Sequence, residues 1–135
     1  MSQENWQNEV KRMQGLLKNF VTTHPGILNI AIVSEEGLPM ASILEKNVDD
    51  VWYSKISAAA SAMVERILLE TRKGEEQYCI MQGRDGCVII FFLKQPRANA
   101  PTPASGVLFI TMAPPADAFT LLPDLFALKT KYFEI

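Results

Sequence analysis

The sequence has few of the residues that hold metals or perform nucleophilic catalysis. Its 135 residues include two cysteines and one histidine. Cys79 and Cys87 do not form a CxxC pair, and no cysteine and histidine cluster has zinc-binding spacing. In a hairpin that turns at residues 84–86, Gly83 would face Cys87, leaving Cys79 roughly 13 Å away along the strand, too far for a disulfide. We therefore expect two buried thiols, no metal and no cofactor.

The motifs of nucleotide-binding and hydrolytic enzymes are also missing. No GxxxxGK[ST], GxGxxG, GxSxG or HExxH sequence occurs. His24 stands in a connection, where an exposed or helix-capping role is expected. Glu35 and Glu36 suit a solvated hairpin tip, and residues 49–50 suit a helix cap. Because these groups supply no nucleophile with a base and an orienting partner, the sequence predicts that the chain is not an enzyme.

The chain lacks an excess of charge and a long apolar run. Its 13 Lys+Arg and 15 Asp+Glu give a formal net charge of -2, which argues against a nucleic-acid binder. The longest apolar run, residues 87–93, is far shorter than the ~20 residues that span a bilayer. The first residues, MSQENWQNEV, do not resemble a secretory signal. We expect one cytoplasmic domain over residues 1–135.

Hydrophobic periodicity predicts three helices, over residues 3–21, 48–72 and 115–132. Pro123 should kink the last helix or split it in two. The middle helix contains a run of small side chains, residues 58–62, between two apolar stripes. These stripes are Trp52, Ile56, Ala59, Met63 and Ile67 on one side, and Tyr53, Ala60, Val64 and Leu68 on the other.

Five strands are predicted between these helices. Pro39 cannot donate a hydrogen bond to a neighbouring strand, so the second strand should lie at a sheet edge. The last two strands are apolar on both faces, which requires an antiparallel sheet covered on both sides. Residues 95–105 hold three prolines and should form a loop. The predicted strands are 27–34, 38–44 (after a turn at 35–37), 75–82, 86–94 and 106–113.

This order of elements and three segments resemble the roadblock / dynein light chain family. The first segment is GILNIAIV followed by EGLPMAS, residues 26–33 and 36–42. The second is the alanine-rich helix that ends in MVER, residues 63–66. The third is QGRDG, residues 82–86, before the most apolar strand. The long proline loop and the proline within the last helix depart from the family pattern.

The resemblance implies an α/β (α+β) fold, the profilin-like roadblock fold, in a single roadblock domain. Its five-stranded antiparallel sheet has the order 2-1-5-4-3, with the middle helix on one face and the terminal helices on the other. Residues 1–22 would form the N-terminal helix, and residues 95–105 the proline-rich loop.

The resemblance also implies a homodimer that pairs through the third strand and the middle helix. The residues support this, because the third strand is an edge without proline or lysine, and small side chains let two helices approach closely. An alternative is that the alanines only fit the helix onto its own sheet. The predicted dimer-interface residues are Ala58, Ala62, Glu76, Gln77, Tyr78, Cys79, Ile80 and Met81.

The resemblance further implies a protein that binds and regulates Ras-like small GTPases, or scaffolds motor and signalling complexes, without a catalytic centre for nucleotide chemistry of its own. The resemblance places such a GTPase on the paired middle helices. Arg84, at a hairpin tip, is interpreted as a turn residue rather than an arginine finger. The candidate GTPase-facing residues are Lys55, Ser61, Glu65, Arg66 and Leu69, with ordinary solvated side chains as the alternative.

Other functions stay open. A structural adaptor, such as a motor-complex light chain, would bind one fixed subunit whatever the nucleotide state. A paralogous roadblock protein is a further candidate partner, because the same strand and helix would serve a heterodimer. A small-molecule sensor would hold its ligand between sheet and helices. The expected core is entirely apolar, without convergent polar groups, so the sequence does not favour a sensor.

Overall fold

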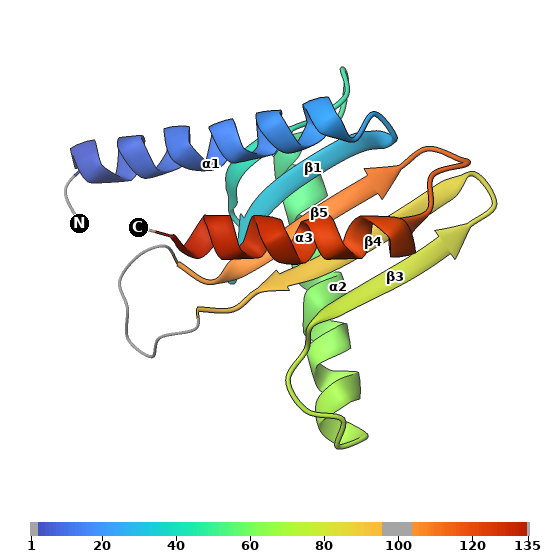
Figure 1. Ribbon diagram of the computed structural model, residues 1–135. Helices are drawn as coiled ribbons and strands as arrows, with labels where there is room; N and C mark the ends of the chain where they lie inside the picture. The colour runs from blue at the N-terminus through green and yellow to red at the C-terminus, as the bar shows by residue number, and fades with distance from the viewer. Residues whose placement is uncertain (1–2, 96–103, 135) are drawn as a thin grey trace.

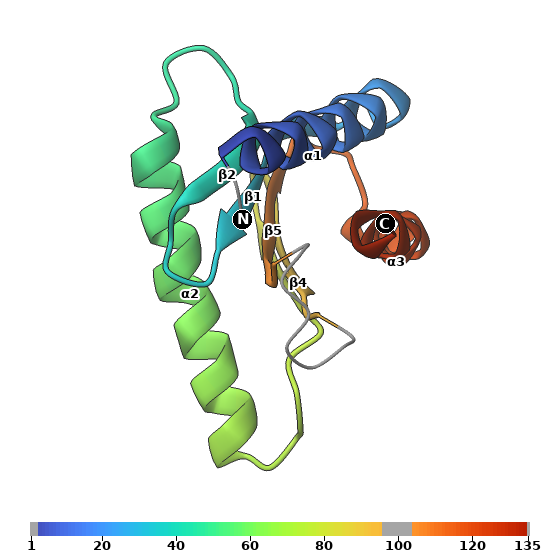
Figure 2. The same ribbon diagram turned by 90° about the vertical axis from the view of Figure 1, so that its left-hand side faces the viewer.

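The computed structural model describes residues 3–95 and 104–134, which form a five-stranded antiparallel sheet between two helical layers (Figure 1). The strand order β2-β1-β5-β4-β3 confirms the prediction. The helix α2 covers one face, and α1 and α3 cover the other (Figure 2). The elements are α1 (Gln3–Thr23), β1 (Ile27–Ser34), β2 (Pro39–Ile43), α2 (Asp50–Glu70), β3 (Tyr78–Gly83), β4 (Gly86–Leu93), β5 (Gly106–Met112) and α3 (Ala118–Phe133).

The core has two parts, one on each face of the sheet. Alternate residues of β4 and β5 point to opposite faces, so strands that are apolar throughout supply both parts. The part beneath α1 and α3 is the larger and includes Met13, Leu17, Ile89, Ile110 and Leu125. The part beneath α2 is smaller and includes Ala31, Tyr53, Ile90, Phe92 and Phe109.

The first hairpin and its edge strand follow the prediction. Gly37 has φ +88° in the turn between β1 and β2, a conformation that glycine adopts without steric cost. The strand β2 begins at Pro39 and lies at one edge of the sheet.

The second hairpin differs from the prediction by one residue of register. Gly83 pairs with Gly86 and Gln82 pairs with Cys87, so the turn contains only Arg84 and Asp85. Cys79 packs among the residues beneath α2, whereas Cys87 is buried beneath α1 and α3. The two thiols are free and on opposite faces of the sheet.

The ends of the helices agree with the sequence prediction at the start of α2 and depart from it elsewhere. Asp49 caps α2 by accepting a hydrogen bond from the Val51 amide at 3.2 Å. The helix α2 ends at Glu70 rather than at residue 72, and the chain after it turns with φ +57° at Arg72 and φ +92° at Gly74. The helix α3 begins at Ala118 and runs past Pro123 as one helix, so of the two predicted outcomes, a kink or a split, the split is wrong. Pro123 lacks the amide that would donate to the Phe119 carbonyl, so α3 continues past it with one intrahelical hydrogen bond fewer.

Two predicted segments extend beyond the described residues. The N-terminal helix was expected over 1–22, and α1 is described from Gln3. Most of the expected proline loop, 95–105, lies outside the described part of the chain.

Candidate functional site

The outer face of α2 carries a line of exposed apolar side chains. Met63 is 64% exposed and Leu69 is 77% exposed. Of the two apolar stripes expected on this helix, the one that begins at Trp52 therefore faces away from the sheet. The other packs toward the sheet through Tyr53, Ala60 and Val64. The large exposed apolar residues of α2 are Val51, Trp52, Ile56, Met63, Ile67 and Leu69.

The inner face of α2 is unusually polar. Ser54, Ser57 and Ser61 are buried against the sheet, and their hydroxyl groups have no hydrogen-bond partner among the described residues. Their spacing of three and four residues places them on one face of the helix. This spacing is visible in the sequence, but the expectation of an entirely apolar core overlooked it.

Tyr53 attaches this inner face to the sheet. Its hydroxyl donates to the carbonyl oxygens of Asn29, at 3.3 Å, and Phe109, at 3.1 Å. The Asn29 side chain in turn donates to Thr111 and Glu45 and accepts from the Glu45 amide. Burial raises the pKa of Tyr53 well above its ordinary value, so the phenol remains a donor into alkaline solution. Sequence periodicity placed Tyr53 on a stripe but did not reveal this network.

The two edges of the sheet are protected differently. At the β2 edge, the Gln14 side chain from α1 donates to the Ser42 carbonyl at 2.7 Å and accepts from the Ser42 amide at 3.1 Å. At the opposite edge, β3 pairs with β4 alone among the described strands. Tyr78 and Met81 are exposed there. An edge of this kind, without proline or lysine, is a ready template for another strand.

Lys94 links α2 to the segment before β3. Its Nζ lies 2.6 Å from Glu76 Oε1 and 3.7 Å from Glu65 Oε1. Burial disfavours the charged lysine, but the hydrogen bond with Glu76 and the nearby carboxylate charges outweigh it and raise the pKa of Lys94. Burial also disfavours the charged form of Glu76. The hydrogen bond from Lys94 and its positive charge outweigh this effect of burial, so the pKa of Glu76 lies below its usual range.

The predicted interface residues lie on α2 and around β3, with one correction. Ser61 was expected to face a GTPase, but it is buried against the sheet, so it cannot contribute to an outer surface. Ala58 lies against the turn at Gly37 of its own chain, where an added Cβ on that glycine would be 3.0 Å from the Ala58 Cβ. Ala62, Lys55, Glu65, Arg66 and Leu69 are exposed on α2. Gln77, Tyr78 and Met81 are exposed, and Glu76, Cys79 and Ile80 are half-buried.

Arg84 is an exposed turn residue. Its side chain is 92% exposed, and its Nε lies 3.5 Å from the Asp85 carboxylate. The hairpin tip thus presents a solvated ion pair between neighbouring residues, as the interpretation of a turn residue predicts.

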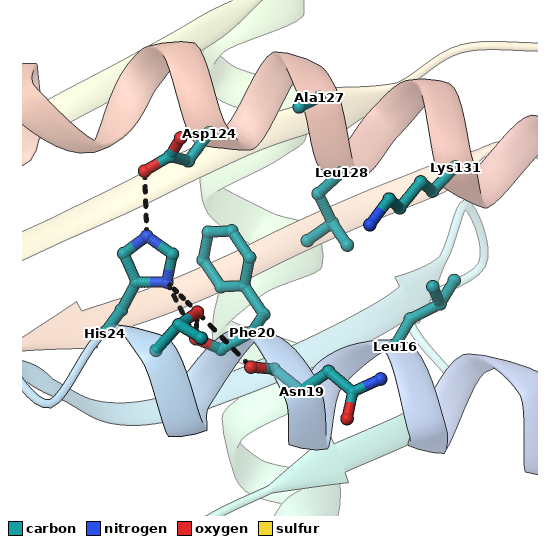
Figure 3. Close-up of a pocket in the computed structure, with 9 residues that line it drawn as sticks. Leu16, Asn19, Phe20, His24, Asp124, Ala127, Leu128 and Lys131 are labelled. Atoms are coloured by element: carbon teal, nitrogen blue, oxygen red, sulfur yellow. Dashed lines mark hydrogen bonds and ion pairs between the residues drawn. The ribbon is translucent and has the colours of Figure 1, made fainter.

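An open cleft of about 490 Å³ separates α1 from α3 (Figure 3). At one end, His24 Nδ1 lies 2.7 Å from the Phe20 carbonyl oxygen, and His24 Nε2 lies 2.9 Å from Asp124 Oδ2. The His24 ring therefore lies between the C-terminal end of α1 and Asp124 of α3 and connects the two helices.

This cluster combines the residue types of a catalytic triad, a threonine, a histidine and an aspartate. Thr23 Oγ1 lies 3.0 Å from His24 Nδ1. The same nitrogen lies 2.7 Å from the Phe20 carbonyl oxygen, so the ring is held against the end of α1. The Thr23 hydroxyl itself donates to carbonyl oxygens of α1. The contact is suited to holding two helices together rather than to nucleophilic chemistry.

Residues 3–95 and 104–134 contain neither a metal-binding cluster nor a membrane-spanning helix. Within these ranges, no three histidine, cysteine or acidic side chains gather as a metal site would require. No helix in these ranges has both the length and the apolar character needed to cross a bilayer.

The covered sheet, the strand order and the placement of the three helices together define the roadblock/LC7 fold. A roadblock/LC7 domain from Streptomyces avermitilis superposes with a TM-score of 0.73 at 11% identity, covering 87% of this chain and 92% of that one. Myxococcus xanthus MglB gives 0.72 at 11%, covering 98% and 90%. The gliding protein MglB from Thermus thermophilus gives 0.73 at 9%, covering 93% and 88%.

These similarities lie in the structure rather than in the sequence. No family model matches the sequence, and no curated protein matches it. The structural similarities confirm the predicted resemblance at the level of the fold.

Proposed function

We propose that the chain is a non-enzymatic homodimer that regulates or scaffolds a Ras-like small GTPase in the cytoplasm, working as one roadblock domain. The observation that carries this proposal is the exposed apolar stripe on α2 beside the unprotected edge of β3. A contiguous exposed apolar face of this kind marks an interaction surface. The shared roadblock fold supports the family resemblance from which the GTPase partner is taken.

The shape of α2 supports dimerisation through this region. Its C-terminal turns extend past the edge strand β3, so they reach beyond the sheet of their own chain (Figures 1 and 2). Antiparallel pairing of β3 with its copy would extend the sheet beneath these turns. The same two-fold axis would bring the stripes of two α2 helices together. Ala62 and residues 76–81 then contribute to the interface.

The GTPase would contact the outermost side of the paired α2 helices. Lys55 and Arg66 project there as cations, with the exposed Leu69 near the end of the helix. Glu65 is partly engaged by Lys94. A surface that combines apolar and charged groups suits a reversible protein contact.

A charged side chain introduced into the exposed apolar stripe of α2 tests dimerisation. Met63→Glu should convert a dimer into a monomer in multi-angle light scattering at micromolar concentration, because a carboxylate would be desolvated in the interface. Phe119→Glu is the matched control, since Phe119 has a similar exposure of 66% and lies on α3, at the opposite face of the sheet. A monomeric wild-type chain, or equal effects of both substitutions, would contradict the proposal.

The partner is tested with purified Ras-like GTPases loaded with GDP or a non-hydrolysable GTP analogue. Binding should favour one nucleotide state, and Lys55→Glu with Arg66→Glu should weaken it at least about tenfold. Lys11→Glu with Lys18→Glu, on exposed α1 positions, should leave it unchanged. Equal capture of one non-GTPase subunit in both states would instead support a structural adaptor. Preferential pairing with a second roadblock chain would replace the homodimer by a heterodimer.

A further inference from the structure

A cavity of about 280 Å³ lies between α2 and the sheet, where β1 ends, β4 ends and β5 begins. This volume is nearly twice the ~150 Å³ of an apolar cavity that holds benzene. Val33, Phe92 and Val107 form its apolar wall on the sheet side. On the helix side it is lined by Ser57 and Ser61.

The two serines give the cavity its polar character. Ser57 is 0% exposed and Ser61 is 7% exposed, and neither hydroxyl has a hydrogen-bond partner among the described residues. A buried hydroxyl without a partner costs about 1–3 kcal/mol. The serines are four residues apart, so both hydroxyls face the same space. Together they form a pair of donor and acceptor groups to which a bound molecule could hydrogen-bond.

The charges around the cavity restrict the kind of molecule that it suits. Lys94 lines the cavity, but its ammonium group is bonded to Glu76 and lies near Glu65. Glu35 and Glu65 also line the cavity. An anion would meet more negative than positive charge there. A compact cation would meet the apolar wall of the sheet, where desolvation of a charge is costly.

We infer that this cavity binds a small uncharged molecule that has an apolar body and a hydroxyl or amide group. The apolar body packs against Phe92 and Val107, and the polar group exchanges hydrogen bonds with Ser57 and Ser61. Lys55, Arg66 and Leu69 of the proposed GTPase surface do not line this cavity, whereas Glu65 borders both. The cavity also revises the sequence-based view that polar groups do not converge inside the fold.

The test uses three probes that share one ring and differ in the head group: benzyl alcohol, benzylamine and benzoate. Each is titrated into the ¹⁵N-labelled full chain and followed by amide chemical shifts. Benzyl alcohol should give saturable shifts around Ser57–Glu65 and Val107, whereas the two charged probes should not. No saturable binding of the alcohol, or equally tight binding of a charged probe, would overturn the proposal.

Matched serine variants locate the site. Ser57→Ala and Ser61→Ala should each weaken benzyl alcohol binding about fivefold, since each removes one hydrogen bond. Ser61→Leu should abolish it by filling the cavity. Ser54→Ala is the control, because Ser54 is equally buried on the same face but does not line this cavity. A loss of affinity in Ser54→Ala as large as in the other two would also overturn the proposal. Amide-shift dispersion in the free variants checks that each is folded.

Discussion

Tyr53 is the single side chain that most directly fixes α2 on the sheet. Tyr53→Phe keeps the ring, which packs 4.7 Å from the Phe109 ring centroid, and removes only the hydroxyl. The carbonyls of Asn29 and Phe109 then lose their buried donor. We expect the free energy of unfolding, measured in urea, to fall by about 1 kcal/mol. An unchanged value would mean that these hydrogen bonds contribute nothing to stability.

Gly86 occupies a position that no other residue fits. Its φ is +137°, and an added Cβ would lie 2.2 Å from the Met112 carbonyl oxygen. Gly86→Ala should therefore lower the free energy of unfolding by about 2–3 kcal/mol. Gly15→Ala is the control: a Cβ there, on the exposed side of α1, meets nothing within 4 Å. That substitution should stabilise the chain by about 0.5–1 kcal/mol, because alanine favours a helix. Thermal and urea unfolding of both variants would test this contrast.

At the scale of secondary structure, local patterns predicted the elements better than their orientation. Pro39 placed β2 at an edge, and apolar β4 and β5 required a covered sheet, because these signals act within one strand. Which face of α2 packs against the sheet could not be predicted from such local patterns. Two apolar stripes and a row of serines all repeat with helical spacing, and only the packing of the whole chain selects which faces inward.

The register of the second hairpin was missed for a related reason. Both a two-residue and a three-residue turn are compatible with the letters GRDG. The pairing of β4 with β5, in which Cys87 faces Met112, is a long-range contact. The sequence of the turn alone therefore does not determine the register.

The ion pair between Lys94 and Glu76 connects β4 to the segment that leads from α2 to β3. The pKa of Glu76 is lowered in the folded chain, so its contribution to stability is present above its unfolded pKa and is lost as the pH falls through its folded pKa. The pKa of Lys94 is raised, so its contribution is lost only in strongly alkaline solution.

Glu76→Gln should lower the free energy of unfolding by about 1–2 kcal/mol at neutral pH. The difference from wild type should shrink as the solution is acidified through the range in which carboxylates titrate. Glu70→Gln, which breaks a more exposed pair with Arg66, should have little effect at any pH. A wild-type to Glu76→Gln difference that is independent of pH would contradict this assignment. Urea unfolding across a pH series supplies the measurement.

For the molecule as a whole, the unequal protection of the two sheet edges sets the direction in which it can associate. At the β2 edge, the Gln14 side chain forms hydrogen bonds with both the backbone amide and the backbone carbonyl of Ser42. At the β3 edge, the Phe92 amide donates to the Gln77 carbonyl, so Gln77, Cys79 and Met81 direct their backbone groups toward β4. The backbone groups of Tyr78, Ile80 and Gln82 consequently point outward.

Ile80→Pro tests this edge without disturbing the sheet behind it. Proline at this position removes an outward amide and leaves the hydrogen bonds between β3 and β4 in place. We expect it to dissociate the homodimer in light scattering at micromolar concentration. Ile80→Ala, which loses the side chain but keeps the amide, should remain dimeric. If Ile80→Pro stays dimeric while Met63→Glu is monomeric, the two copies associate through α2 alone and the sheet does not continue across the interface.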